Sequence, residues 1–321
     1  MRHAQRLAAV VVFVAATVGT PGTGSLAAPL VLPPSSLSVW RAGAWHEWWR
    51  SERAPTRWSA ADPALATALA WHVVAPGIER SETRLAGAGI AWRTRIVVVR
   101  VDPARVTLSL ELAIGPRDGR PSWSIDRAPS DALLAFNAGQ FVQAMPWGWV
   151  VLDGREHLPP GTGPASAALA IDRAGRPHWI AGDSLAASPW RRGGLRCAFQ
   201  SYPTLLASDG EVAPPLRTPG HGIDLAHRDA RLAIGETREG ALLVVLTRFD
   251  GLGGVAGGAP VGLTSPEMAA VMGALGARDA MMLDGGISAQ MTLRETTGGR
   301  RMRWPGWRKV PLAMLARPRA R

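Results

Sequence analysis

The chain has 321 residues, a formal net charge of +11 and a single cysteine, Cys197. This length suffices for one large domain or two small ones, and a single cysteine excludes an internal disulfide. All but one of the 36 basic residues are arginine, and they are scattered rather than gathered on one predicted helix, so we expect no nucleic-acid partner.

Residues 1–27 have the pattern of a secretory signal peptide. Arg2 and Arg6 give a basic start, an uncharged apolar run covers residues 7–18, and a small-residue cleavage pattern ends at Ala27. The apolar run is too short to span a bilayer, and no later stretch is long and apolar enough. We therefore expect a secreted or periplasmic protein without stable membrane insertion.

Residues 28–75 are predicted to form a Pro/Ser-rich linker followed by a tryptophan-rich helical lead. Trp45, Trp48 and Trp49 recur at helical spacing, and Asp62-Pro63 predicts the start of a second helix. Aromatic stripes on helices more often pack than bind, so we expect these tryptophans to pack against the rest of the protein. Stacking on sugars is the alternative.

Residues 76–321 are expected to form the main domain, in which short predicted strands alternate with turns. The pattern favours an α+β fold with mixed, mostly antiparallel sheets, few helices and an active-site cleft at strand ends. One helix is predicted over 266–275, with Thr264 as its cap, Glu267 completing a capping box and Gly276 at its end. Strands are predicted over 96–101, 106–112, 132–136, 149–152, 167–172, 178–180, 204–207, 231–234, 241–247 and 280–283.

The last predicted strand delivers a carboxylate, Asp284, onto the turn formed by Gly285 and Gly286, and Ser288 and Gln290 follow. Glycines allow a sharp turn and a close approach of a ligand to the main chain. The alternative is a turn whose aspartate bonds only its own backbone.

Asn137 and Gln140 follow another predicted strand through a small-residue turn. Their amides could bond sugar hydroxyls or phosphoryl oxygens, or satisfy the turn itself. A glycine-rich loop over 251–258 lacks the helix that a dinucleotide site needs, so we expect a mobile loop over a cleft.

The segment before the strand at 231–234 is dense in ionisable groups. Arg231 at the mouth of this strand suits phosphate recognition, while Asp224, His227 and Asp229 could perform acid–base work or orient that arginine. Two histidines flank Asp224 at a spacing that permits a metal but is not diagnostic, so we expect no metal site.

Four segments in this order, 137–141, 231–235, 264–267 and 283–291, resemble the phosphodiester glycosidase family. Segments 199–206 and 308–311 look like the family's strand before a turn and its closing strand. The likeness covers about residues 76 to 315 and leaves out the tryptophan-rich lead.

The resemblance implies hydrolysis of a sugar-1-phosphodiester, with N-acetylglucosamine-1-phosphodiester as one candidate, to a free sugar and a phosphomonoester without a cofactor. In this reading Asp284 is the nucleophile or base, Glu267 the second carboxylate and Arg231 the phosphate ligand. The residues expected to position sugar and phosphate are Asn137, Gln140, Asp224, His227, Gly285, Gly286, Ser288 and Gln290.

Two departures from the family pattern predict altered substrate fit. Ile287 stands where a third glycine is common, and a branched residue disfavours positive φ; Ala138 stands where glycine is usual. Two alternatives stay open: a non-catalytic envelope glycan-binding protein on the same fold, and a hydrolase using Ser288 with His227, for which no nucleophile elbow is present.

Overall fold

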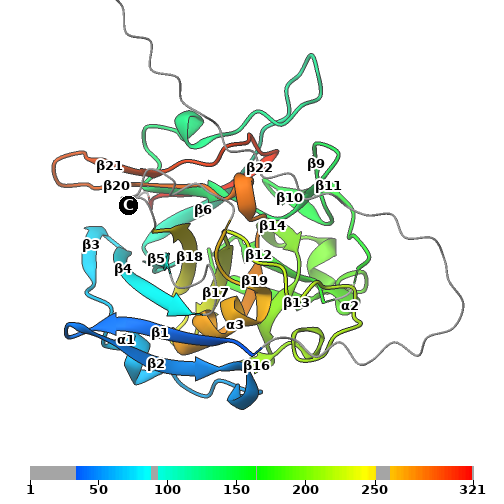
Figure 1. The fold of residues 1–321 in the computed structure, drawn as a ribbon. Coiled ribbons are helices and arrows are strands. Elements are labelled where there is room, and N and C mark those ends of the chain that lie inside the picture. The colour runs from blue at the N-terminus through cyan, green and yellow to red at the C-terminus, as the bar shows by residue number, and fades with distance from the viewer. Residues whose placement is uncertain (1–33, 88–92, 164, 251–260, 320–321) are drawn as a thin grey trace, which may run out of the picture. The chain divides into compact units, whose positions relative to one another are not determined.

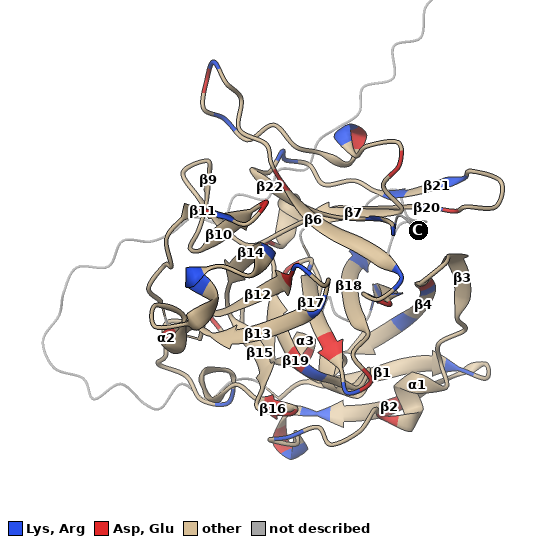
Figure 2. Ribbon diagram, turned by 180° about the vertical axis from the view of Figure 1, so that it is seen from behind, with Lys and Arg blue, Asp and Glu red and all other residues tan. Residues whose placement is uncertain are grey.

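The computed structural model describes residues 34–87, 93–163, 165–250 and 261–319. The predicted signal peptide and the glycine-rich loop over 251–258 lie outside the described residues. Lys and Arg are distributed over many elements rather than gathered on one (Figure 2).

A central antiparallel sheet runs through the molecule (Figure 1). Its edge strand β3 (His72–Ala75) pairs with β4, off the main path. The main path is β16 (Glu211–Val212), β15 (Thr204–Ala207), β19 (Ala277–Met282), β17 (Leu232–Thr237), β18 (Leu242–Phe249), β5 (Thr94–Val101), β4 (Ile78–Gly87), β1 (Ser36–Arg41) and β2 (Ala44–Arg50).

Two smaller antiparallel sheets and few helices complete the described part of the chain, so the predicted mostly antiparallel sheets with few helices are confirmed. The α-helices of the described residues are α1 (Pro63–Ala66), α2 (Gly182–Leu185) and α3 (Ser265–Ala274), and a ribbon pairs β8 (Phe141–Val142) with β9 (Met145–Pro146). One small sheet has the order β11 (Arg155–Leu158), β10 (Val150–Leu152), β14 (Leu195–Ser201), β12 (Ala167–Asp172) and β13 (Pro177–Ala181); the other has β21 (Arg301–Trp304), β20 (Met291–Arg294), β7 (Leu134–Asn137), β22 (Leu312–Pro318) and β6 (Val106–Leu112).

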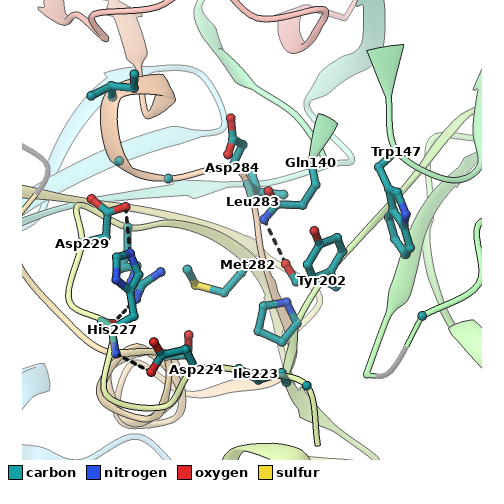
Figure 3. Close-up of a pocket in the computed structure, with 18 of the residues that line it drawn as sticks. Gln140, Trp147, Tyr202, Ile223, Asp224, His227, Asp229, Met282, Leu283 and Asp284 are labelled. Atoms are coloured by element: carbon teal, nitrogen blue, oxygen red, sulfur yellow. Dashed lines mark hydrogen bonds and ion pairs between the residues drawn. The ribbon is translucent and has the colours of Figure 1, made fainter. Parts of the chain in front are cut away.

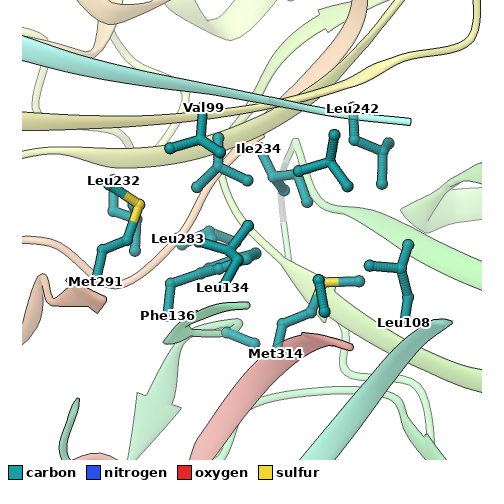
Figure 4. Packing of buried hydrophobic residues seen from close by; sticks show 14 of the residues in the cluster. Val99, Leu108, Leu134, Phe136, Leu232, Ile234, Leu242, Leu283, Met291 and Met314 are labelled. Carbon is teal, nitrogen blue, oxygen red and sulfur yellow. The ribbon is translucent and has the colours of Figure 1, made fainter. Parts of the chain in front are cut away.

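Alternate residues of the central strands enter two different cores, because successive strand side chains point to opposite faces. Val97 and Val244 pack in the core shared with the two smaller sheets. Phe136 and Met314 lie in the same core (Figure 4). Val98 and Val245 pack in a second core with α3. The central sheet therefore lies between α3 on one face and the smaller sheets on the other.

Helix α3 begins as predicted, with both bonds of the Thr264–Glu267 capping box formed, and ends before Gly276, whose φ is +89°. Nearly all of its side chains are buried, so the helix packs against the protein on most of its surface. Trp58 covers part of it: a Cβ on Gly273 would lie 2.2 Å from the Trp58 ring.

The predicted helix at Trp45 is wrong, because residues 44–50 form strand β2 paired with β1. Asp62 does cap a helix, accepting a bond from the Ala64 amide at 2.7 Å, but α1 has only four residues. Trp49 and Trp58 are buried in the second core, as expected. Trp40 and Trp45 instead stay exposed at 43% and 45% and contact each other edge to face at 5.2 Å.

Segment 308–311 is not the closing strand, although Val310 forms an isolated bridge with Trp123. The closing strand of the described chain is β22, which starts at Leu312, directly after this segment, and pairs with β6 and β7. The residues before it are thereby left as a loop, which brings Arg308 toward the candidate site.

Candidate functional site

The turn after β19 is held on two sides by backbone hydrogen bonds. The Asp284 amide donates to the Gly139 carbonyl and the Gly286 amide to the Ala230 carbonyl, both at 2.8 Å. Asn137 Nδ2 donates to the Asp284 carbonyl at 2.8 Å. The Asp284 carboxylate therefore leaves a backbone whose position is fixed by the ends of β7 and β17.

Asn137 and Gln290 stabilise this turn through hydrogen bonds from the protein interior and do not face a ligand. Both are buried, and Asn137 Oδ1 accepts a bond from the Gln290 amide at 2.9 Å. Gln290 Nε2 donates to the Arg308 carbonyl at 3.0 Å, and its Oε1 accepts from the Ile125 amide at 3.1 Å. These two side chains, with the buried Ser288, do not line the cavity, so the structure gives them supporting positions.

The two glycines are needed for close packing. A Cβ on Gly285 would lie 2.5 Å from the Ala230 carbonyl oxygen, and one on Gly286 would lie 2.7 Å from Asp229 Oδ2. Gly286 also has a φ of +56°, whereas Ile287 is not among the residues with positive φ. The branched side chain at 287 is thus accommodated without strain and faces the cavity, 37% exposed.

A cavity of about 580 Å³ lies at this turn, where β14 and β19 end and β17 begins (Figure 3). Three carboxylates line it, together with two arginines, a histidine and two aromatic rings. These lining residues are Asp224, Asp229, Asp284, Arg231, Arg308, His227, Trp147 and Tyr202. A cavity with convergent charged groups is the usual form of a ligand site.

Asp284 is a half-buried carboxylate of this cavity, with a side chain 19% exposed. Burial raises the pKa of its carboxyl above the ordinary value, while Ser288 and Arg308 act in the opposite direction. Arg308 Nη2 lies 3.6 Å from Asp284 Oδ2, and that oxygen has no hydrogen bond to another described residue. Since Arg308 Nε donates to Ser288 Oγ at 3.1 Å, the guanidinium is held beside the carboxylate.

Asp229 faces the same cavity from the segment before β17. His227 Nε2 lies 3.5 Å from Asp229 Oδ2, and the Ala230 amide donates to Oδ1 at 2.8 Å. Burial raises the pKa of this carboxyl, and the nearby Arg231, Ala230 amide and His227 oppose that shift. Asp229 and Asp284 therefore form a pair of carboxyls whose pKa values are both raised by burial.

Arg231 and Asp224 mainly brace the loop that carries His227. Arg231 Nε donates to the Leu263 carbonyl at 2.8 Å and Nη2 to the His227 carbonyl at 2.5 Å. Asp224 Oδ1 accepts from the amides of Ala226 and His227 at 3.0 and 3.1 Å. Both side chains still line the cavity, and burial lowers the pKa of the Arg231 guanidinium.

Glu267 does not line the cavity. It is fully buried, and its two oxygens accept a pair of 2.7 Å bonds from Arg228, with further bonds from the Thr264 amide and the Ser35 hydroxyl. Because both of its oxygens already accept hydrogen bonds, the Glu267 carboxylate stabilises the helix cap and forms an ion pair with Arg228. The expectation that Glu267 is the second carboxylate at the reacting centre therefore has no geometric support, and Asp229 is better placed.

Gln140 and two aromatic residues form the opposite wall. Gln140 Nε2 donates to the Tyr202 carbonyl at 3.0 Å, and the Trp147 and Tyr202 rings meet edge to face at 4.7 Å. Gln200 stabilises the backbone next to this wall, because its Oε1 accepts hydrogen bonds from the Trp149 and Gly161 amides at 3.0 and 2.9 Å. The wall therefore consists of aromatic rings on a backbone that a buried amide fixes.

The structure brings several of the candidate residues together around one cavity: Gln140, Asp224, His227, Arg231, Asp284, Gly285 and Gly286. The sequence did not indicate Arg308, Trp147 or Tyr202 as site residues, whereas Asp229 is among the residues expected to perform acid–base work or orient Arg231. The resemblance of segment 308–311 to a family strand was a signal for Arg308. Among the described residues, no group of three or more His, Cys, Asp or Glu is arranged to hold a metal ion.

Comparison with known proteins supports one family. A family model described as phosphodiester glycosidase matches residues 130–316, which is more than half of the chain. Comparison of the sequence with curated proteins gives no match. No helix in the described residues has the length and apolar character needed to cross a membrane.

One solved structure shares the fold over most of its length. The catalytic domain of zebrafish N-acetylglucosamine-1-phosphodiester alpha-N-acetylglucosaminidase, auto-inhibited by its pro-peptide, is 17% identical, with a TM-score of 0.56 over 81% of this chain and 87% of that one. A hypothetical protein from Synechocystis is more weakly similar, at 14% identity, with a TM-score of 0.44 over 76% of this chain and 62% of that one. The first match extends the likeness over most of both chains.

Proposed function

The chain belongs to the phosphodiester glycosidase family, and from this premise we propose that it hydrolyses a sugar-1-phosphodiester to a free sugar and a phosphomonoester. One observation carries the proposal: the enclosed Asp284 carboxylate lies 3.6 Å from the Arg308 guanidinium, in a cavity that also contains Asp229. A carboxylate for the anomeric centre and a cation for the phosphate are the two requirements of this reaction.

In the proposed reaction the bond between C1 and the phosphate oxygen breaks. The phosphomonoester leaves with the bonding electrons, the oxygen of water becomes bonded to C1, and a water proton passes to a carboxylate base and then to solvent. A phosphomonoester leaves readily, so less general-acid help is needed than for an alcohol. Asp284 acts as nucleophile or base, and Asp229 replaces Glu267 as the second carboxylate.

Arg308 is the cation best placed to meet the phosphate. Its side chain is 49% exposed, and its planar guanidinium suits bidentate binding of phosphoryl oxygens. Arg231 contributes positive charge at the cavity while bracing the His227 loop. Gln140, Asp224 and His227 would orient the sugar and phosphate, without a metal or another cofactor.

The proposed setting is outside the cytoplasm, because residues 1–27 have the signal-peptide pattern. The second candidate function is a non-catalytic envelope glycan-binding protein on the same fold. The edge-to-face pair of Trp147 and Tyr202 at the cavity favours a sugar ligand in either case.

Purified residues 28–321 tested on a panel of sugar-1-phosphodiesters, including UDP-N-acetylglucosamine, would distinguish the two functions. The proposal expects release of free sugar by the wild type, loss of release in Asp284→Asn, and a lower rate in Arg231→Ala. Glu52→Gln, at an exposed position, is the control and should keep full turnover. Absence of turnover on every substrate, with saturable glycan binding in all variants, would favour the binding protein.

A further inference from the structure

A second cavity, of about 860 Å³, adjoins the candidate site and shares Thr162 and Gly163 with it. Both shared residues are exposed, so they form a common rim rather than a closed wall. The volume of the second cavity lies within the range of small-molecule sites, about 300–1,000 Å³. A ligand in the first cavity that extends past this rim enters the second.

The charges of the second cavity do not suit phosphate. Its ionisable side chains, among the described lining residues, are the carboxylates Asp183, Glu211 and Asp279. Two of them have arginine partners outside the lining: Arg217 lies 3.2 Å from Glu211, and Arg278 lies 3.3 Å from Asp279. Because two of the three carboxylates are paired and the described lining contains no cation, the cavity favours an uncharged ligand over an anion.

Hydroxyl and aromatic groups line the rest of this cavity. Ser166, Thr204 and Ser208 supply hydroxyls, and Leu206 contributes apolar surface. Trp179 lines it too, and its Nε1 donates to the buried Glu236 at 2.8 Å, which fixes the indole. An apolar surface with an oriented aromatic ring and scattered hydroxyls suits a neutral saccharide.

The arrangement of the first cavity gives the direction in which a substrate would lie. Asp229 and His227 lie on one side of Asp284, and Trp147 and Tyr202 lie on the other (Figure 3). Trp147 also packs against the shared rim, since a Cβ on Gly163 would lie 3.1 Å from its ring. A sugar that contacts this aromatic wall therefore lies next to the rim of the second cavity.

We propose that the second cavity binds neutral sugar units that continue from the glycosyl group, so that the substrate is an oligosaccharide linked through its reducing-end C1 to phosphate. This inference rests on the proposed function. The bonds broken and formed are unchanged, and the released product is a free oligosaccharide in place of a monosaccharide. The released reducing end carries the hydroxyl oxygen that came from water.

The test compares the methyl phosphodiesters of N-acetylglucosamine 1-phosphate and of triacetylchitotriose 1-phosphate, with glucose and maltotriose analogues in parallel. We expect kcat/KM for a trisaccharide to exceed that for its monosaccharide by about tenfold or more. Ala186→Trp places a large ring at the exposed edge of the second cavity and should remove this preference while leaving monosaccharide turnover unchanged. Ala187→Trp, on the next exposed residue and outside the lining, is the matched control.

Equal turnover of the two lengths by the wild type, or a preference that persists in Ala186→Trp, would overturn this inference while leaving the proposed function intact. If the wild type hydrolyses no substrate, the proposed function fails instead, and calorimetric titration with triacetylchitotriose and maltotriose tests the cavity directly. Binding that is lost only in Ala186→Trp supports the cavity as a saccharide site. Absence of saturable binding to the wild type overturns it.

Discussion

Replacing Gly286 by alanine should lower the thermal stability through backbone strain and the turnover rate through movement of Asp229. An alanine held at a φ near +56° is strained by about 1–2 kcal/mol. A domain of this size loses about 2–4 °C in melting temperature per kcal/mol, so the melting temperature should fall by about 2–8 °C. The new Cβ would also lie 2.7 Å from Asp229 Oδ2, so the carboxylate must move until it reaches ordinary contact, which begins at 3.4 Å.

Such a displacement at a reacting centre is expected to lower kcat/KM by about 100-fold. Gly119→Ala is the matched control, because Gly119 has a φ of +64° and a Cβ there would meet nothing within 4 Å. Thermal denaturation and turnover of the phosphodiester that the wild type hydrolyses would be measured for both variants. If both lose similar thermal stability and both keep full turnover, Asp229 has no part in the reaction and our assignment is refuted.

Four further predictions follow from burial and charge. Asp284→Asn should raise the melting temperature near neutral pH, because burial raises the folded-state pKa of this carboxyl and its ionisation therefore costs stability. The cost begins at the unfolded-state pKa of about 3.9 and is complete above the raised folded-state pKa, so the gain should vanish below about pH 3.9. A lower melting temperature of the variant at neutral pH would contradict this prediction. Arg308→Met should shift the acidic limb of the pH–rate profile to higher pH, since it removes the cation that favours the ionised Asp284; an unmoved limb would argue against this pairing. Arg248→Met should cost at least about 2 kcal/mol in urea denaturation, whereas exposed Arg117→Met should cost almost nothing, because buried Arg248 Nη2 donates to three backbone carbonyls. Cys197, whose pKa burial raises to about 12, should react with a thiol reagent only after unfolding, and rapid labelling of the native protein would contradict its burial.

The strands that the sequence predicts well are those whose signals are local. Strands over 106–112, 167–172 and 204–207 match β6, β12 and β15 at both ends, because apolar runs there are bounded by turn residues. The lead was misread because Trp45, Trp48 and Trp49 fit helical spacing, while their structure depends on a partner strand. Pairing with β1, including a register shift between Leu37 and Ser38, decides for a strand.

The same distinction between local signals and long-range contacts applies to the candidate site. The Asp284 turn could be predicted because its glycines and preceding strand are adjacent in sequence. Glu267 fits a capping box and a catalytic carboxylate equally well by sequence, and only its burial against Arg228 separates the two. Asp229 and Arg308 reach the cavity through contacts between distant segments, which spacing along one chain does not encode.

The buried amides of Asn137, Gln200 and Gln290 hold the cavity almost entirely through main-chain atoms. Main-chain atoms are the same whatever side chain a residue carries. The rings of Trp147 and Tyr202 can therefore be exchanged without disturbing the support of the Asp284 turn. Libraries that randomise this wall and hold the three amides constant would show which ligands this scaffold can be made to accept.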